Sequence, residues 1–270
     1  MLKRLISMVV GIGILATVMT LNNTLIFTIA VAIVATLGIY EFYNAMRQIN
    51  IKPIEWIGYL SAILLVAVPY ISINTLRFVL TISLPIILLI LFILSVFSNL
   101  KRNIVDISVT VTGIIYITYL FAFLIFTRQM NNGVYYLWFI LGGGWITDTF
   151  AYLIGVLFDK TIGNHKFSKI SPNKSVEGCI GGVIGCVVFF VAYTYYLNSI
   201  GIVLNYFAMG IIGIITSIIS QIGDFAASAI KRYCKIKDFG NIMPGHGGIL
   251  DRFDSILLIA PFIYTVFSII

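Results

Sequence analysis

Apolar residues in this sequence fall in long, continuous blocks rather than in alternating or helical-stripe patterns. Blocks of about 18 or more apolar residues are typical of membrane-spanning helices, because about 20 helical residues cross the roughly 30 Å hydrocarbon layer. The strands of a membrane β-barrel would instead alternate over about 10 residues. The pattern therefore predicts an all-α fold and a polytopic integral membrane protein.

Nine blocks qualify as transmembrane helices, with edges defined to within a few residues. They cover approximately residues 5–21, 24–44, 56–74, 78–98, 104–127, 134–158, 178–198, 203–230 and 251–270. The first block follows two basic residues, as the apolar part of a secretory signal would. No small-residue cleavage site precedes a polar mature domain, so we interpret this block as a retained span.

Basic residues predict the orientation of these spans. If the N-terminus is cytoplasmic, the cytoplasmic segments carry 15 of the 17 Lys and Arg residues, and the opposite side receives only Arg77 and Arg128. Cytoplasmic loops of membrane proteins are enriched in Lys and Arg. The bias therefore predicts about nine transmembrane helices with the N-terminus in the cytoplasm.

Composition supports the membrane class and explains the net charge. Hydrophobic residues make up 60% of the chain and charged residues only 10%, whereas a soluble domain carries about 25% charged residues. The net charge of +7 is mostly cytoplasmic, where it faces anionic headgroups and anionic substrates. It therefore requires no nucleic-acid partner. The three cysteines match neither a disulfide framework nor a zinc-site spacing.

Polar residues divide the chain near residue 135. We predict N-terminal transmembrane helices over 1–135 and a C-terminal catalytic region over 136–270, which together form one integrated membrane domain. The N-terminal part has only three acidic residues, and each lies close to the end of a predicted span. Interfacial anchoring accounts for these three residues, which are Glu41, Glu55 and Asp106.

Acidic residues in the C-terminal part lie within apolar blocks. Asp148 and Asp224 each lie well inside a predicted span, and two further residues, Asp251 and Asp254, begin the last one. A carboxylate in hydrocarbon costs several kcal/mol, so such residues usually face a polar cavity and mark a functional site. The i, i+3 spacing of Asp251 and Asp254 places both on one helix face.

Converging carboxylates at Asp224, Asp251 and Asp254 would need cations to offset their repulsion. Oxygen ligands suit Mg²⁺, which is usually held by one or two carboxylates together with substrate phosphates. Zinc would require Cys or His ligands, and these do not cluster in this sequence. In the alternative interpretation, each Asp pairs with a nearby Lys or Arg, or caps a helix, as Asp251 could at the start of the last span.

Two predicted cytoplasmic segments carry polar residues suited to anions. Residues 166–178 bring basic, hydroxyl and glycine residues to a helix start, where free backbone N–H groups bind oxyanions; a plain capped loop is the alternative. Residues 231–248 contain a basic run typical of cytoplasmic charge, followed by His246 between glycines. Gly247 and Gly248 would let the backbone approach a ligand closely, although His246 could also be a surface loop residue.

These segments resemble signature motifs of the phosphatidate cytidylyltransferases, also called CDP-diacylglycerol synthases. Residues 171–178 read SPNKSVEG and resemble a family segment S-P-x-K-[ST]-x-E-G. Residues 223–254, which end in PGHGGILDRFD, resemble the family signature, and residues 145–152 resemble a third family segment. By contrast, the sequence contains no Walker, Rossmann or nucleophile-elbow pattern.

The resemblance implies a reaction in which phosphatidate attacks the α-phosphorus of CTP and yields CDP-diacylglycerol and pyrophosphate. It implies two cation sites formed by Asp224, Asp251 and Asp254. One site holds Mg²⁺, and the cation in the second site is unidentified. The implied catalytic residues are Asp224, Lys231, Arg232, His246, Asp251, Arg252 and Asp254. The implied substrate-binding residues are Ser171, Pro172, Lys174, Glu177 and Lys237. Asp148 is either an additional metal ligand or a group that orients a lysine.

We expect a multi-pass protein of the cell inner (plasma) membrane with its active site facing the cytoplasm. CTP would enter from the cytoplasm, while the diacylglycerol tails of phosphatidate would stay in the lipid bilayer. A homo-oligomer is left open. Two alternatives are a related CTP-dependent transferase or kinase acting on another membrane lipid, and a secondary transporter. A transporter should show two pseudo-symmetric halves, whereas the polar residues here gather in one half.

Overall fold

The structure is a computed structural model that describes residues 13, 17–19, 23–71, 73–97, 102–159, 174–242 and 247–270. The chain divides into two compact units. Unit 1 comprises Met1–Asn131 and Tyr233–Arg252, and unit 2 comprises Asn132–Arg232 and Phe253–Ile270. The sequence-based division between residues 135 and 136 rests on chemical character rather than on packing, and it stays a prediction.

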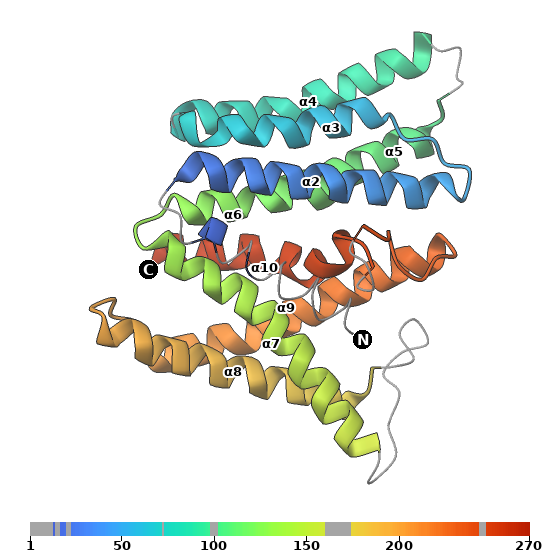
Figure 1. Ribbon diagram of the computed structural model, residues 1–270. Helices are drawn as coiled ribbons and strands as arrows, with labels where there is room; N and C mark the ends of the chain where they lie inside the picture. Colours follow the sequence, from blue (N-terminus) through green and yellow to red (C-terminus); the bar gives the residue numbers. More distant parts are fainter. Residues whose placement is uncertain are drawn as a thin grey trace. The chain divides into compact units, whose positions relative to one another are not determined.

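Helices form the architecture of both units (Figure 1). In unit 1 they are α2 (Thr24–Arg47), α3 (Glu55–Ile63), the 3₁₀-helix η1 (Leu64–Tyr70), α4 (Ile73–Phe97), α5 (Ile104–Gly113), the π-helix η2 (Ile114–Tyr119) and α6 (Leu120–Arg128). In unit 2 they are α7 (Gly133–Asp159), α8 (Val176–Ser199) and α9 (Tyr206–Tyr233). Helix α10 (Leu250–Ile269) begins in unit 1 and continues in unit 2. The predicted all-α class is confirmed.

Among the described residues, six helices are long and apolar enough to cross a membrane. They are Thr24–Arg47, Ile104–Arg128, Gly133–Phe158, Val176–Ser199, Tyr206–Tyr233 and Leu250–Ile269. Each coincides with a predicted span, so the polytopic membrane class is confirmed. Shorter apolar helices cover Glu55–Tyr70 and Ile82–Phe97. The span predicted at 5–21 lies largely outside the described residues, and the total of nine spans and the cytoplasmic N-terminus stay predictions.

The span predicted at 56–74 is shorter and less regular than the sequence pattern indicates. Its α-helical part ends at Ile63, and the chain continues as the 3₁₀-helix η1, which contains Pro69. Proline has no N–H to donate and restricts the residue before it, so an α-helix tends to stop ahead of it. The structure therefore corrects this helical segment to Glu55–Tyr70.

Tyr43 of α2 fixes the packing of three helices in unit 1. Its side chain is fully buried, and its hydroxyl donates a hydrogen bond to the carbonyl oxygen of Thr110 in α5 at 2.9 Å. Gly58 of α3 and Gly113 of α5 lie so close to the ring that a Cβ atom at either position would overlap it. Small residues permit this kind of close approach between membrane helices.

Two of the three N-terminal acids make buried contacts that interfacial anchoring did not predict. Asp106 is only 3% exposed. It forms a capping box with Asn103 at the start of α5, and its Oδ1 accepts a hydrogen bond from the backbone N–H of Lys52 at 2.7 Å. Glu41 is only 1% exposed and binds backbone groups, as described below. Glu55 does lie near the surface, in an ion pair with Arg47 at 2.8 Å.

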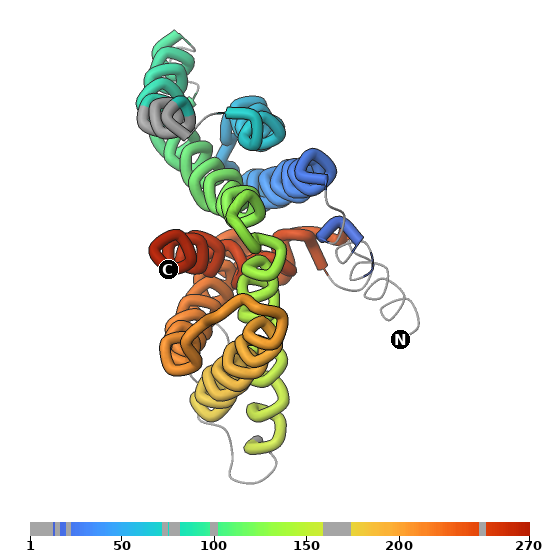
Figure 2. The backbone as a smooth tube through the Cα atoms, turned by 90° about the vertical axis from the view of Figure 1, so that its left-hand side faces the viewer, coloured from blue at the N-terminus to red at the C-terminus, as the bar shows by residue number. Residues whose placement is uncertain are grey.

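Helix α7 packs against the other three helices of unit 2 through three successive glycines. At Gly142, an added Cβ atom would overlap a phenylalanine ring of α8. At Gly143, it would lie 2.8 Å from Thr216 of α9. At Gly144, it would lie 3.0 Å from Ile256 of α10. The absence of side chains thus lets α7 run obliquely across α8 (Figure 1), while α8 and α9 lie side by side and are joined by a short turn (Figure 2).

Candidate functional site

Charged side chains of unit 2 come together where α9 and α10 are in backbone contact at Gly223. A Cβ atom at Gly223 would lie 2.9 Å from the carbonyl oxygen of Asp254 and 3.2 Å from the Cα atom of Ser255. Glycine permits this approach because it has no side chain. Asp224 follows Gly223, and it lies within electrostatic range of the Asp254 carboxylate, as does Asp148. The Gly-Asp pair in the sequence therefore combines a packing residue with a charged one.

Two lysines of unit 2 face these carboxylates. The Nζ atom of Lys174 forms an ion pair with Oδ2 of Asp224 and lies 4.6 Å from the centroid of the Phe225 ring. Lys231 is 9% exposed, and its Nζ atom lies 4.0 Å from Oδ2 of Asp254. That separation is beyond the range of a hydrogen bond. Asp224 is therefore neutralised by direct contact, whereas the Lys231–Asp254 pair is looser.

Asp148 of α7 is connected to Asp254 through Ser255 of α10. The Ser255 hydroxyl donates a hydrogen bond to Oδ2 of Asp148 at 3.1 Å, and the Ser255 backbone N–H donates to Oδ1 of Asp254 at 2.8 Å. Ser255 is 1% exposed, so both bonds are shielded from water. Sequence reasoning missed Ser255, and its position beside Asp254 was the available signal.

Hydrogen bonds between side chains and helices hold α7, α8 and α9 together. The Thr147 hydroxyl of α7 donates to the Ser217 hydroxyl of α9 at 3.2 Å. The Gln221 amide of α9 donates to the Cys179 carbonyl oxygen of α8 at 3.1 Å and to the Ser217 hydroxyl at 3.3 Å. Thr147 precedes Asp148, and Gln221 lies one turn before Asp224 in the chain. These bonds therefore restrict the relative positions of α7 and α9, the helices that carry the two acids.

The oxygen-rich cluster of unit 2 has the chemistry of a cation site. Carboxylate oxygens fit Mg²⁺, and the Asp254 carboxylate is buried, where a charge requires a close partner. Within the described part of the chain, however, no group of three or more His, Cys, Asp or Glu side chains is arranged closely enough to hold a metal ion. The lysine pairs at Asp224 and Asp254 match the alternative interpretation from the sequence. Metal binding by these residues and by Asp148 stays a prediction.

Asp251 belongs to unit 1, where backbone groups hold its carboxylate. Its Oδ2 atom accepts hydrogen bonds from the N–H groups of Phe239 at 2.8 Å and Gly248 at 3.0 Å. Gly247 has a φ of +81°, which glycine adopts without strain. These bonds agree with the alternative in which Asp251 caps the start of the last span. They leave its predicted role as a metal ligand untested.

Glu41 of α2 binds the same segment of unit 1 and was missed by sequence reasoning. Its Oε1 accepts a hydrogen bond from the N–H of Ile249 at 3.0 Å, and its Oε2 accepts one from the N–H of Leu250 at 2.8 Å. Donors at a helix start have no intrahelical partner, and here the carboxylate supplies one. The sequence carried no signal for these contacts, because the partners of Glu41 lie more than 200 residues away in the chain.

Three predicted site residues of unit 2 lie at the ends of helices. Glu177 is in the first turn of α8, which Ser175 caps by accepting a hydrogen bond from the N–H of Gly178 at 3.1 Å. The N–H of Gly178 is thus occupied by Ser175, as expected if this helix start is a plain capped loop rather than an oxyanion site. Lys231 and Arg232 lie in the last turn of α9, and Arg232 is exposed.

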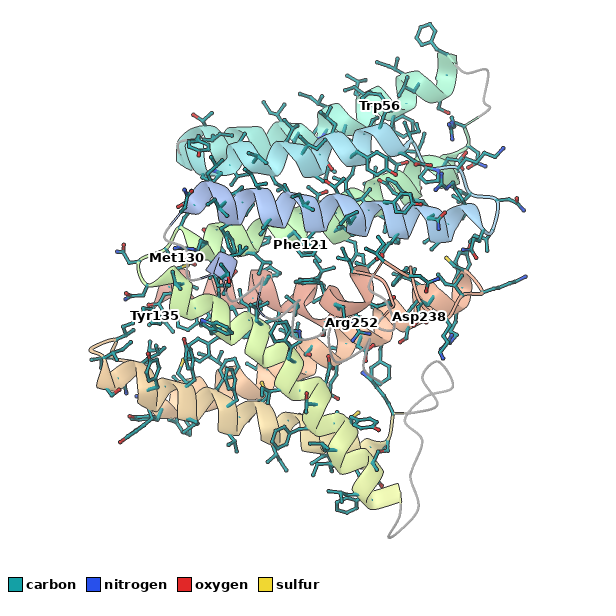
Figure 3. All side chains as sticks on the ribbon, in the orientation of Figure 1. Trp56, Phe121, Met130, Tyr135, Asp238 and Arg252 are labelled. Atoms are coloured by element: carbon teal, nitrogen blue, oxygen red, sulfur yellow. The ribbon has the colours of Figure 1, made fainter. Side chains whose placement is uncertain are left out.

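Two basic site residues lie in the unit 1 segment between α9 and the start of α10. Lys237 is exposed, as is Arg252, which lies in the first turn of α10. Figure 3 shows Arg252 at this position and Asp238, the neighbour of Lys237, on the connecting segment. Three further predicted site residues lie outside the described residues: Ser171, Pro172 and His246.

Comparisons with known proteins agree with the sequence motifs. A family model described as "Cytidylyltransferase family" matches residues 2–270. Among proteins named phosphatidate cytidylyltransferase, that of Bacillus subtilis (strain 168) is 39% identical over 157 residues, which are 57% of this chain and 56% of that protein. The one from Staphylococcus haemolyticus is 36% identical over 63% of this chain and 64% of its own length. The one from Staphylococcus aureus (strain COL) is 30% identical over 89% of both chains. The matches to the first two relatives thus span less than two thirds of their length.

Proposed function

Because this chain belongs to the cytidylyltransferase family, we propose that it is a membrane-embedded phosphatidate cytidylyltransferase. It transfers CMP from CTP to phosphatidate and gives CDP-diacylglycerol and pyrophosphate. The observation that carries the proposal is the charged cluster of unit 2, in which Asp224 pairs with Lys174 and the buried Asp254 faces Lys231. Charges within apolar helices are costly and mark functional sites.

The proposed reaction is a single displacement at phosphorus. A phosphate oxygen of phosphatidate bonds to the α-phosphorus of CTP, and the bond from that phosphorus to the oxygen of the leaving pyrophosphate breaks. A phosphate monoester has a second pKa of about 6 and is largely ionised at neutral pH, so the attack requires no strong general base. The main difficulty is to bring two polyanions together and to stabilise the leaving group, which is a matter of position and charge.

Basic side chains of the chain would meet this negative charge. The ion pair with Asp224 holds Lys174 in place before a substrate binds, and Lys231 lies 4.0 Å from the Asp254 carboxylate. A phosphate oxygen could then replace the carboxylate as the partner of either ammonium group. We assign the phosphate groups to Lys231, Arg232, Lys237, His246 and Arg252. We assign the CTP side to Ser171, Pro172, Lys174 and Glu177.

We propose Mg²⁺ as the cofactor in one of two cation sites, the second cation being unidentified, with Asp224, Asp251 and Asp254 as ligands and Asp148 as a further candidate. When bound, Mg²⁺ supplies charge neutralisation for the attacking and leaving oxygens, which is worth several kcal/mol. The contact at Gly223 keeps Asp224 near Asp254. Asp251 precedes Asp254 by three residues in α10, a spacing that places two side chains on one helix face.

We also propose that the protein lies in a plasma membrane with this site on the cytoplasmic side. The support is the distribution of Lys and Arg, which predicts that the segment before α8 and the segment after α9 lie on the same side as the N-terminus. In this orientation, cytosolic CTP reaches the basic residues from the water phase. Phosphatidate reaches them from the bilayer, where its acyl chains remain.

Labelled CTP tests the reaction and the acceptor together. Purified protein in lipid nanodiscs receives CTP labelled at either the α- or the γ-phosphate, with phosphatidate or a polyprenyl phosphate as the acceptor. Cytidylyl transfer predicts that only the α-label enters the lipid, and that phosphatidate is the acceptor. Entry of the γ-label would identify a kinase instead, and product with the polyprenyl phosphate alone would overturn the proposed substrate.

A further inference from the structure

We propose that Glu41 is a positioning residue of the active site, which anchors the start of α10 and thereby orients Asp251. The inference rests on the proposed function, because it takes Asp251 as a metal ligand. Glu41 lies in the N-terminal half of the chain, outside the motifs that resemble family segments. It acts through the backbone of α10 and makes no substrate contact itself.

Both carboxylate oxygens of Glu41 are used by this anchor. Oε1 accepts the N–H of Ile249 at 3.0 Å, and Oε2 accepts the N–H of Leu250 at 2.8 Å. Hydrogen bonds to an ionised acceptor are stronger than neutral ones, and a negative charge at a helix start is further stabilised by the helix dipole. Since Glu41 is 1% exposed, water does not compete for these bonds. Glu41 is therefore built to hold the backbone of α10.

Glycines give the carboxylate the room that it needs. A Cβ atom at Gly240 or Gly248 would overlap the Glu41 carboxylate. On α2 itself, a Cβ atom at Gly38 would lie 3.9 Å from Cδ1 of Leu250, so the helix that carries the acid also approaches α10 with an apolar contact. Gly248, the second residue after His246 in the sequence, thus leaves room for Glu41.

The anchor and the Asp251 carboxylate share one stretch of backbone. Gly248 lies against Glu41, and its N–H donates to Oδ2 of Asp251 at 3.0 Å. The two carboxylates are close enough for their charges to repel. Backbone N–H groups offset that repulsion, and they belong to Phe239, Gly248, Ile249 and Leu250. Replacement of the Glu41 carboxylate by an amide would leave one of the two donors at Ile249 and Leu250 without an acceptor and the other with a neutral one, and would loosen the segment that orients Asp251.

Amide hydrogen exchange tests the anchor without substrate or metal. In the wild-type protein, the amides of Ile249 and Leu250 should be protected, and Glu41→Gln should speed their exchange about tenfold, because a buried donor loses its charged acceptor. The control is Glu55→Gln, the same change in a more exposed ion pair of unit 1, which should leave these amides unaffected. Unprotected amides in the wild-type protein overturn the proposal, whether or not a variant folds.

A Mg²⁺ titration separates positioning from a general loss of stability. Glu41→Gln should raise the half-saturating Mg²⁺ concentration about tenfold while the KM for CTP at saturating Mg²⁺ changes less than about twofold. The titration is followed both by CDP-diacylglycerol formation and by Mg²⁺-dependent protection of residues 247–252 from exchange. Glu41→Asp, which keeps the charge, should restore part of the Mg²⁺ affinity. A lower maximal rate with an unchanged Mg²⁺ dependence would indicate a merely structural role and overturn the proposal.

The two measurements distinguish failure of this inference from failure of the proposed function. If wild-type protein makes CDP-diacylglycerol but Glu41→Gln changes neither exchange nor Mg²⁺ dependence, the positioning role is wrong and the function stands. If folded wild-type protein makes no CDP-diacylglycerol, the proposed function fails and the positioning role falls with it. The exchange at Ile249 and Leu250 still reports in that case whether the anchor exists.

Discussion

Gly223 of α9 lies against Asp254 of α10, so closely that a Cβ atom at position 223 would be 2.9 Å from the Asp254 carbonyl oxygen. Real Cβ atoms essentially never approach other heavy atoms this closely. Any side chain at this position would therefore push the two helices apart. Because Asp224 is the next residue, the same contact sets the distance between two carboxylates. Helix packing and site geometry in unit 2 thus depend on one glycine.

Gly223→Ala is expected to destabilise the protein by about 1–3 kcal/mol, since backbone atoms must shift to admit a methyl group. Displacement of Asp224 should also lower the rate of CDP-diacylglycerol formation more than about tenfold. The control is Gly210→Ala on the same helix, where a Cβ atom would meet only Val191 at 3.9 Å. Alanine favours helices over glycine, so the control should be neutral or stabilising. Equal thermal unfolding midpoints and rates for the two variants would contradict this account.

Lys174→Met removes the partner of Asp224 and a positive charge assigned to CTP. We expect the KM for CTP to rise at least about tenfold, the usual scale for losing a charge-assisted hydrogen bond. Steady-state kinetics with varied CTP and fixed phosphatidate measure the change. Lys52→Met, which alters an exposed lysine of unit 1, is the matched control and should keep the wild-type KM. A KM for CTP that stays at the wild-type value in Lys174→Met would remove this residue from the nucleotide site.

Asp148 and Ser255 should act as one unit because a hydrogen bond at 3.1 Å joins them. A double-mutant cycle with Asp148→Asn, Ser255→Ala and the double variant measures their coupling. We expect the double variant to be no slower than the slower single variant. Fully additive losses in the rate of CDP-diacylglycerol formation would instead mean that Asp148 acts independently of Ser255.

Tyr43→Phe tests the packing of unit 1 apart from the chemistry. Loss of the hydroxyl leaves the Thr110 carbonyl oxygen without this donor, and the cost should be about 1 kcal/mol. Tyr40→Phe, on the same helix but at an exposed position, should leave the unfolding midpoint unchanged. Both variants should retain wild-type turnover below their unfolding temperature. A lower midpoint for Tyr40→Phe than for Tyr43→Phe would show that the buried hydrogen bond is not the stabilising element.

The helical membrane class was predictable because the bilayer imposes a simple physical rule. A segment that crosses hydrocarbon must be long and apolar, and this rule alone locates the six long helices. Local geometry carries less signal. The π-helix at Ile114–Tyr119 has no counterpart in the apolar pattern, and the irregular η1 could be suspected only from Pro69.

The charged cluster of unit 2 was predictable in its residue types but not in its contacts. Acids inside apolar blocks identify Asp148, Asp224 and Asp254, because the cost of burying a charge is independent of the fold. Which helix each glycine packs against depends on the three-dimensional fold, and the spacing of glycines in the sequence does not contain that information. The contacts of Glu41 were not predictable for a similar reason, since its partners lie 208 and 209 residues away.

The central claim is tested most directly by the transfer of label from CTP to lipid by purified protein. The wild type and Asp254→Asn are each assayed with Mg²⁺ and with EDTA. We predict a chloroform-soluble cytidine product from phosphatidate that disappears with EDTA and falls about a thousandfold in the variant, as expected for loss of a cation ligand. Size-exclusion elution confirms that both proteins are folded. Product that persists undiminished in EDTA and in Asp254→Asn would contradict the proposed cation site, and no product from folded wild-type protein would contradict the cytidylyltransferase activity itself.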